Sequence, residues 1–594
     1  MKVQRSTYSL RKRLLGISVV LGAFGLVLVA RAAHLQLISP DFYQEQGDAR
    51  FLREVPIATS RGTITDRNGE PLAISSPVES VWANPKELLQ HADRMPALAK
   101  ALGIPHDVLV QRISQRADKE FVYLRRHMNP DIAQEVVDMG IPGVYSQREF
   151  RRFYPHGEVM AHVLGFTNID DRGQEGLELA FDDWLTGKPG AQQIIRDRRG
   201  RTVENVDLIR AAEPGHDLTL SIDRRIQYLA YRELKTALVE RGASSGSIVV
   251  LDVASGEILA MVNQPSYNPN SRDGSGPETQ RNRAVTDVIE PGSVMKTLTI
   301  AAALESGKFK ADSTVDTSPG YMSLPGGYSI HDFRNYGVLS MAGVLSKSSN
   351  VGATRISNEL TKEHQFDMYQ RFGLGHVSGS GFPGESTGVL RSPNEWGPTE
   401  KASVSYGYGL SVTPLQLARA YAALGNGGRL HEATFVKDAD SASVQIIDPA
   451  IAAQLMTMLE TVTATEGTAS RAAVLGYRVA GKTSTVRKAG GGSYIAKRYV
   501  AVFVGLVPAS NPKFAMAVVI HDPQGLEYGG GAVSAPIFHH VMDGALRLMD
   551  VPPDNIEQWF AAQAKKNAAA LAAAPAVATP VAPVPAPAGP EALQ

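Results

Sequence analysis

The sequence predicts a protein that mixes helices and sheet, of class α/β (α+β). We expect one N-terminal transmembrane helix, then an elongated mixed pedestal domain, and then a domain in which a sheet is flanked by helices. Three observations predict this fold class. A basic N-terminus precedes an apolar run, residues 50–215 are rich in Arg, Asp and Gly with short β-like runs, and residues 216–550 have strand-like runs at both ends around helical patterns. Strands that enclose helices favour a single sheet covered by helices. At 594 residues the chain has room for at least two folded units.

The N-terminus carries a membrane signal, because Lys and Arg residues precede the uncharged run Leu14–Ala30. Positive charge favours the cytoplasmic side, so we expect a cytoplasmic tail over residues 1–13, an anchor over residues 14–38 and the rest of the chain outside the cytoplasm. A cleaved signal peptide is the alternative, since Ala30-Arg31-Ala32 resembles a cleavage site. The apolar run exceeds the roughly 7 to 15 residues of the apolar h-region of a signal peptide, which favours the anchor.

The C-terminal tail, residues 561–594, consists largely of Ala and Pro. Proline disfavours both helix and sheet, and alanine buries too little apolar area to offset the entropy of ordering. We therefore expect this tail to be disordered.

The pedestal, or dimerisation-like, domain over residues 50–215 contains β-like runs such as Gly62–Thr65 and Phe121–Leu124. The character changes at about residue 216, where a compact core is expected to begin. In this core the expected strands are Asp217–Ile222, Ser247–Asp252, Glu257–Val262, Arg478–Ala480, Tyr499–Val507 and Phe514–His521, and the expected helices are Val294–Glu305, Gly343–Glu359, Pro414–Leu424 and Ala450–Val462.

The composition excludes several classes of function. Sixty Lys plus Arg balance sixty Asp plus Glu, so no overall charge draws the chain to nucleic acid. The chain has no cysteine, which removes disulfides, thiol nucleophiles and cysteine-bound metals. We expect the function to lie in local sites.

The main candidate for chemistry is Ser293 in the segment Glu290–Lys296, where a Pro-Gly turn comes before an apolar helix. Residues three apart share a helix face, so Lys296 can take the proton of the Ser293 hydroxyl if its amine is neutral. N–H groups at the helix N-terminus can stabilise an oxyanion. The spacing alone is weak evidence, because Ser9/Lys12 and Ser510/Lys513 share it, and an ordinary N-cap serine is the alternative.

Two further clusters carry polar groups. The segment Ser346–Asn350 offers hydroxyl, amine and amide groups that can line a cleft, with a solvated helix cap as the alternative. In the strand-like segment Lys482–Thr485, alternate residues share a face, so Thr483 and Thr485 can offer two hydroxyls to a carboxylate beside the cationic lysine. An exposed edge strand is the alternative for this segment. Gly490–Gly492 is the expected hairpin turn after it.

The order Ser-x-x-Lys, Ser-x-Asn, Lys-Thr-x-Thr resembles the class B penicillin-binding proteins, and the resemblance runs from the anchor to about residue 545. The forms of the segments Glu290–Lys296, Ser346–Gly352 and Tyr406–Gln416 are most similar to the division-specific, septal members. The pedestal motifs that share the resemblance are Arg61–Gly69, Arg152–Pro155, His162–Gly165 and Gly173–Glu178.

The resemblance implies a transpeptidase domain over residues 216–550 that cross-links peptidoglycan stem peptides through an acyl-serine and is acylated by β-lactams. It implies a location at the bacterial inner membrane with the catalytic domain in the periplasm, no metal or organic cofactor, and partners among a membrane glycosyltransferase and other division proteins. The implied roles are Ser293 as nucleophile, Lys296 as its base, Ser348 as proton relay, Asn350 as a holder of the peptide or acyl amide, Lys482, Thr483 and Thr485 as binders of the substrate carboxylate, and the N–H groups of Ser293 and Thr485 as the oxyanion hole.

Ser484 departs from the family pattern, which has glycine at this position. By strand alternation we expect its side chain to face away from the substrate and toward the helix of Ser293. Two alternatives stay open at this point. One is an elongation-type transpeptidase or a D,D-carboxypeptidase with the same chemistry, and the other is a catalytically silent structural division protein in which Ser484 marks a decayed site.

Overall fold

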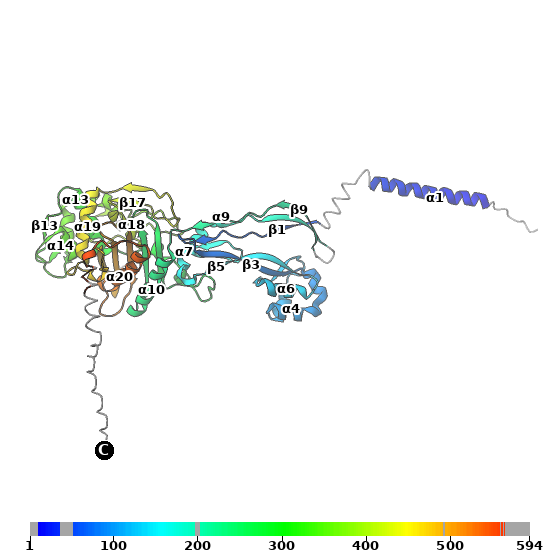
Figure 1. Cartoon of the computed structure of the whole chain (residues 1–594), viewed down its shortest axis with the longest axis horizontal. Helices are drawn as coiled ribbons and strands as arrows, with labels where there is room; N and C mark the ends of the chain where they lie inside the picture. The colour runs from blue at the N-terminus through cyan, green and yellow to red at the C-terminus, as the bar shows by residue number, and fades with distance from the viewer. Residues whose placement is uncertain are drawn as a thin grey trace, which may run out of the picture.

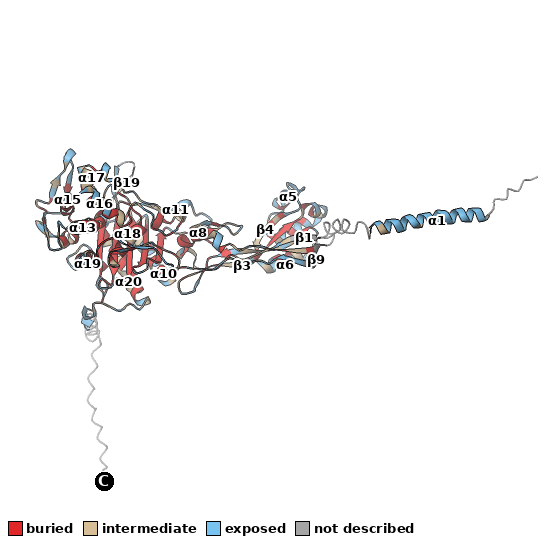
Figure 2. Ribbon diagram, turned by 90° about the horizontal axis from the view of Figure 1, so that it is seen from above, coloured by how far each residue is buried: buried red, intermediate tan, exposed pale blue. Residues whose placement is uncertain are grey.

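A computed structural model of the chain describes residues 10–35, 52–196, 202–490, 493–558, 560–561 and 564. A long pedestal of strands extends from a domain with a helix-covered sheet (Figure 1). Buried residues gather in that sheet domain and in a small lobe at the far end of the pedestal (Figure 2). The predicted tail over residues 561–594, except 561 and 564, and the turn residues 491–492 lie outside the described residues.

Helix α1 (Leu10–Ala33) is the one helix in the described ranges that is long and apolar enough to cross a membrane. Its span Arg11–Ala33 has a mean hydropathy of 2.2, and none of it is buried. A helix of this length rises by about 35 Å, which covers a hydrocarbon core of about 30 Å. The structure thus has the apolar helix that the anchor requires, while residues 36–38 of the expected span are outside the described residues.

The pedestal is built on long antiparallel strands. β3 (Pro71–Ala83) pairs with β5 (Val144–Phe153) and with β4 (Val122–Met128), and β2 (Ile64–Thr65) lies beside the start of β3. A separate three-stranded sheet has the order β1-β8-β9. Its strands are β1 (Leu52–Ile57), β8 (Gly190–Arg196) and β9 (Thr202–Arg210).

The distal lobe of the pedestal contains helices that the sequence did not predict: α4 (Met95–Leu102), α5 (His106–Ser114) and α6 (Pro130–Asp138). Each has only eight or nine residues, so its period is hard to recognise in the sequence. Their apolar residues recur at i and i+3 or i+4 and face a core of their own. Members of that core include Leu98, Leu102, Leu109, Ile113 and Val136.

The sheet domain has five antiparallel strands in the order β12-β11-β21-β20-β19. Helices α10 (Arg224–Arg241) and α20 (Gly530–Leu548) pack on one face, and α18 (Pro414–Gly425) packs on the other. This confirms the predicted sheet flanked by helices. The strands are β11 (Ser245–Asp252), β12 (Ile258–Gln264), β19 (Ala480–Gly490), β20 (Ser493–Val507) and β21 (Phe514–His521).

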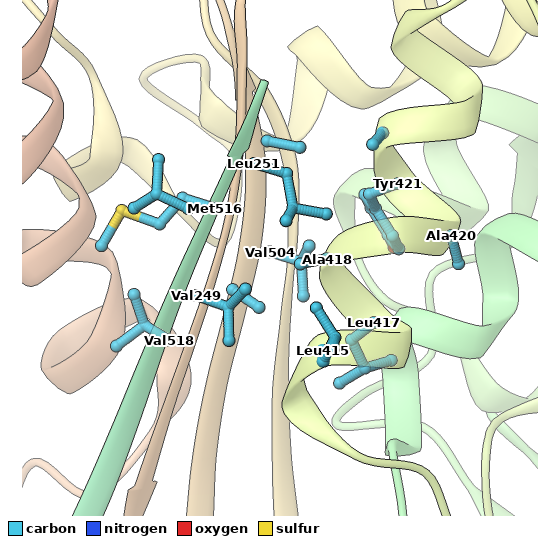
Figure 3. Packing of buried hydrophobic residues seen from close by; sticks show 14 of the residues in the cluster. Val249, Leu251, Leu415, Leu417, Ala418, Ala420, Tyr421, Val504, Met516 and Val518 are labelled. Atoms are coloured by element: carbon cyan, nitrogen blue, oxygen red, sulfur yellow. The ribbon is translucent and has the colours of Figure 1, made fainter. Parts of the chain in front are cut away.

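Side chains alternate across this sheet, as Figure 3 shows. Val249 and Val504 point toward α18, while Met516 and Val518 point to the opposite face. All four are fully buried. Because both faces are covered, the central strands read as nearly continuous apolar runs rather than as an alternating pattern. One hydrophobic core extends from this sheet to the base of the pedestal.

Three predicted elements were wrong in extent. The expected strand Asp217–Ile222 is only β10 (Leu218–Thr219), and it pairs with β2 of the pedestal, because this segment passes from one unit to the next. The expected helix Gly343–Glu359 is two helices, α14 (Met341–Ser346) and α15 (Asn350–Glu359), because Ser348 adopts a φ of +57°. In addition, β19 begins at the last residue of the expected strand Arg478–Ala480.

Candidate active site

Ser293 lies in the 3₁₀ turn η4 (Gly292–Met295), directly before helix α13 (Lys296–Glu305). Gly292 has a φ of +57°, and its N–H donates to the carbonyl oxygen of Gly407 at 2.9 Å. A Cβ on Gly407 would lie 2.1 Å from the carbonyl oxygen of Gly292, so a side chain cannot be accommodated there. The predicted position of the serine at a helix start is confirmed, with a 3₁₀ first turn.

Lys296 connects the serine to the second motif. Its Nζ lies 2.9 Å from Ser293 Oγ, 2.6 Å from the carbonyl oxygen of Ser348 and 2.7 Å from Asn350 Oδ1. The side chain is fully buried. The spacing of three residues therefore places amine and hydroxyl in direct contact, as the sequence predicted.

The environment of Lys296 favours the neutral amine. Burial lowers the pKa of Lys296 well below its usual value, the charge of Lys482 lowers the pKa further, and Asp332 opposes the shift. A neutral amine has one lone pair and two N–H groups, so it can accept from Ser293 and still donate to Ser348 and Asn350. This arrangement is that of a general base poised beside a hydroxyl nucleophile.

Ser348 lies between two buried lysines. Its Oγ is 3.2 Å from Lys296 Nζ and 3.1 Å from Lys482 Nζ. The positive φ of Ser348 breaks the helix and turns this hydroxyl between the amines. Burial lowers the pKa of Lys482 to about 7. A hydroxyl that contacts two amines can pass a proton between them.

Asp332 organises the start of α15 and was not predicted from the sequence. Its carboxylate accepts from Ser349 Oγ at 2.5 Å, from the N–H of Asn350 at 2.6 Å and from the N–H of Val351 at 3.0 Å. Asn350 Nδ2 donates to the carbonyl oxygen of His331 at 3.0 Å. The amide of Asn350 is thereby oriented so that its oxygen faces Lys296.

Among the described residues, the side-chain hydroxyl of each of the two β19 threonines has one hydrogen-bond partner. Thr485 Oγ1 accepts from the N–H of Gly530 at 3.0 Å, so its own proton is available to an acceptor such as a carboxylate. Thr483 Oγ1 lies 3.0 Å from Thr468 Oγ1. Thr468 is exposed and was not predicted, because it belongs to a loop that no local pattern connects to the strand.

Ser484 faces the nucleophile turn, as strand alternation predicted. Its Oγ accepts a hydrogen bond from the backbone N–H of Ser293 at 2.9 Å. The side chain is 3% exposed. A Cβ on Gly292 would lie 2.4 Å from this oxygen, so the glycine makes room for the serine.

These contacts join the residues of all three motifs. Ser293, Lys296, Ser348, Asn350 and Lys482 form one network of hydrogen bonds. Thr483 and Thr485 continue along the strand that carries Lys482. The arrangement combines a hydroxyl nucleophile, a buried amine base and an edge of hydroxyl and amine groups suited to an anion.

Comparisons with known proteins show the family of this chain. Residues 246–543 match the family model of the penicillin binding protein transpeptidase domain, and residues 56–220 match that of the penicillin-binding protein dimerisation domain. Peptidoglycan D,D-transpeptidase FtsI of Escherichia coli is 44% identical over 533 residues, which cover 89% of this chain and 90% of that protein. A probable peptidoglycan D,D-transpeptidase, PbpC of Pseudomonas aeruginosa, is 43% identical and covers 90% of this chain and 94% of its own length.

Solved structures show the same architecture. A peptidoglycan synthetase from Bifidobacterium adolescentis superposes with a TM-score of 0.68 at 26% identity, over 85% of this chain and 98% of that one. The transpeptidase domain of Burkholderia pseudomallei penicillin-binding protein 3 is 40% identical, with a TM-score of 0.52, over 56% of this chain and 97% of that one. Fold and site thus define a penicillin-binding protein with a serine transpeptidase domain. More specifically, the chain belongs to the class B penicillin-binding proteins of the FtsI type.

Proposed function

We propose that this protein is the septal peptidoglycan D,D-transpeptidase of its cell, which cross-links stem peptides through an acyl-Ser293 intermediate and is acylated by β-lactams at the same residue. The observation that carries the proposal is the 2.9 Å contact between Ser293 Oγ and the fully buried Nζ of Lys296. The likeness to FtsI of Escherichia coli over most of both chains supports the role in division.

In the acylation step, Ser293 Oγ attacks the carbonyl carbon of the penultimate D-Ala, and its proton passes to Lys296 Nζ. The carbonyl electron pair moves onto oxygen, where backbone N–H groups stabilise the negative charge. When the tetrahedral intermediate collapses, the C–N bond breaks and the leaving amine of D-Ala takes a proton through Ser348. Lys482, Thr483 and Thr485 hold the terminal carboxylate during this step.

In the transfer step, an amine of a neighbouring stem peptide attacks the ester carbonyl and loses a proton to the base. The bond to Ser293 Oγ breaks, and the serine regains its proton from Lys296. Asn350 holds the acyl amide while the acceptor enters. A β-lactam takes the place of the D-Ala-D-Ala end in the first step, and its acyl-enzyme hydrolyses slowly because no leaving group departs.

The proposal extends to the whole chain. Residues 1–13 form a cytoplasmic tail and residues 14–38 a single membrane anchor, which places the pedestal over residues 50–215 and the transpeptidase domain over residues 216–550 in the periplasm. The apolar helix α1 supports this arrangement. A membrane glycosyltransferase and other division proteins are the proposed partners.

The experiment that tests the function is labelling of the full-length protein with a fluorescent penicillin. The wild type is expected to take up the label, and Ser293→Ala is expected to lose it while keeping its melting temperature, since one half-buried hydroxyl contributes little to stability. Labelling of Ser293→Ala at the normal yield would overturn the nucleophile assignment. A wild type that takes no label would favour the catalytically silent structural protein instead.

A further inference from the structure

The hydroxyl of Ser484 accepts a hydrogen bond from a backbone N–H group that the proposed reaction needs. Ser484 Oγ accepts from the N–H of Ser293 at 2.9 Å, on the face of β19 opposite to Thr483 and Thr485. The N–H of the nucleophile is one of the two donors proposed for the oxyanion hole. In this structure that donor is therefore already satisfied by a side chain of the protein itself.

The packing around Ser484 holds its hydroxyl in this place. The residue is 3% exposed, so bulk water does not compete for the contact. A Cβ on Gly292 would lie 2.4 Å from Ser484 Oγ and 2.6 Å from Val486 Cγ2, so the hydroxyl fills the space beside the glycine. Gly292 is in turn fixed by the hydrogen bond from its N–H to Gly407. Strand β19 therefore packs closely against the turn at Gly292, and the Ser484 hydroxyl lies between them next to Ser293.

We infer that Ser484 competes with the substrate for the oxyanion hole, so that acylation requires the N–H of Ser293 to move its hydrogen bond from Ser484 Oγ to the carbonyl oxygen. This inference rests on the proposed function of Ser293. One N–H has a single hydrogen, and an acceptor that loses it without access to water is left unsatisfied. Ser484 is thus a positioning residue that lowers the rate at which this enzyme is acylated.

The charge that develops during acylation decides which acceptor receives the N–H of Ser293. As the bond between Ser293 Oγ and the carbonyl carbon forms, the proton goes to Lys296 and the electron pair goes to the carbonyl oxygen. The oxygen then becomes a stronger acceptor than a neutral hydroxyl, so the N–H transfers to it in the transition state. The cost of the lost contact to Ser484 remains in the barrier.

The test uses Ser484→Ala in the full-length protein, because this change removes the hydroxyl and keeps the Cβ. The second-order rate of acylation by penicillin is expected to rise by about two- to tenfold, which is the range of one net hydrogen bond. Infrared spectroscopy of the acyl-enzyme is expected to show the ester carbonyl band at lower frequency than in the wild type, because the N–H is donated to it without a competitor. A purely structural role would not shift this band.

Two controls bracket the result. Ser221→Ala removes another fully buried serine hydroxyl, which donates to the carbonyl oxygen of Ile258 at 2.8 Å, and is expected to leave the acylation rate unchanged. Thr485→Val removes a hydroxyl from the other face of the same strand and is expected to slow acylation. Ser484→Gly is the second test variant should Ser484→Ala not fold, and its rate is expected to rise in the same direction.

Acylation of Ser484→Ala and Ser484→Gly at or below the wild-type rate would overturn the inference, as would an unchanged carbonyl band. These outcomes differ from a failure of the proposed function. If Ser293→Ala takes no penicillin, the nucleophile stands whatever the Ser484 variants do. If Ser293→Ala is still acylated, the proposed function fails before the question of Ser484 arises.

Discussion

Two clusters of buried cations among the described residues differ in what each cation contacts. In the pedestal, Arg61 Nε and Arg152 Nε lie 2.7 and 2.6 Å from the carboxylate of Glu178, and all three side chains are at most 1% exposed. In the active site, Lys296 and Lys482 contact hydroxyl, amide and carbonyl groups, and among the described residues neither forms an ion pair.

The difference decides what each cluster can do. A buried guanidinium beside a carboxylate keeps its charge and fixes the position of the strands and helices around it. A buried ammonium without a counter-ion loses its proton readily, because burial penalises the charged form. The pedestal cluster is therefore suited to holding structure, and the lysine pair is suited to moving protons.

The largest expected effect is that of Lys296→Ala. Removing the base should slow acylation by penicillin by about 10² to 10⁴-fold, the usual contribution of general-base assistance. The matched control is Lys488→Ala, which removes a lysine of the same sheet that lies 2.8 Å from Asp522, and its rate should stay normal. Second-order acylation rates measure both variants, and an unchanged rate for Lys296→Ala would remove this lysine from the mechanism.

A substitution in the pedestal cluster should lower the free energy of unfolding and leave the rate of acylation unchanged. Glu178→Gln removes the carboxylate that Arg61 and Arg152 share and leaves Arg61 with Asp182 alone, so it should cost about 3 to 5 kcal/mol of unfolding free energy. Glu213→Gln is the control, since its pair with Lys188 is exposed and should cost less than about 1 kcal/mol. Denaturant unfolding measures the loss. A Glu178→Gln protein that is as stable as the wild type, or that folds but is acylated slowly, would contradict the division of roles.

The smallest expected effect is the pH dependence of acylation. Lys296 must be neutral to accept a proton, so the rate should fall as pH falls through its lowered pKa. Lys482 must be charged to hold a carboxylate, and burial lowers its pKa to about 7, so the rate should also fall by about tenfold per pH unit above that value. Because both amines contact Ser348, their titrations are coupled. The fall of the rate at low pH and its fall at high pH therefore report on the lysine pair and not on one lysine each. A rate that keeps rising to high pH would show that the charge of Lys482 is not needed.

Local rules predicted one part of this site and missed another. The spacing of Ser293 and Lys296 and the alternation of Thr483, Ser484 and Thr485 depend only on the periods of helix and strand, and the structure has both. Asp332 and Thr468 reach the site from separate loops, and no period in the sequence connects them to it. The break at Ser348 was missed for a related reason, because a single residue with positive φ leaves no signature in an apolar pattern.

The prediction of the fold from the sequence was limited in the same way. The sheet domain was predictable because its strands and helices are long and apolar, and its type of architecture follows from their order. The distal lobe was not, since its helices are short and become stable only by packing together. The strand β10 looked like the first strand of the core, but hydrogen bonds to β2 assign it to the pedestal sheet.

The most direct test of the central claim is to locate the acylated residue. After incubation with penicillin, mass spectrometry of the intact protein should show a mass increase of one penicillin, and peptide analysis should place it on Ser293. The same increase should be absent from Ser293→Ala and strongly delayed in Lys296→Ala. An adduct on any other residue, or none in the wild type, would contradict the account.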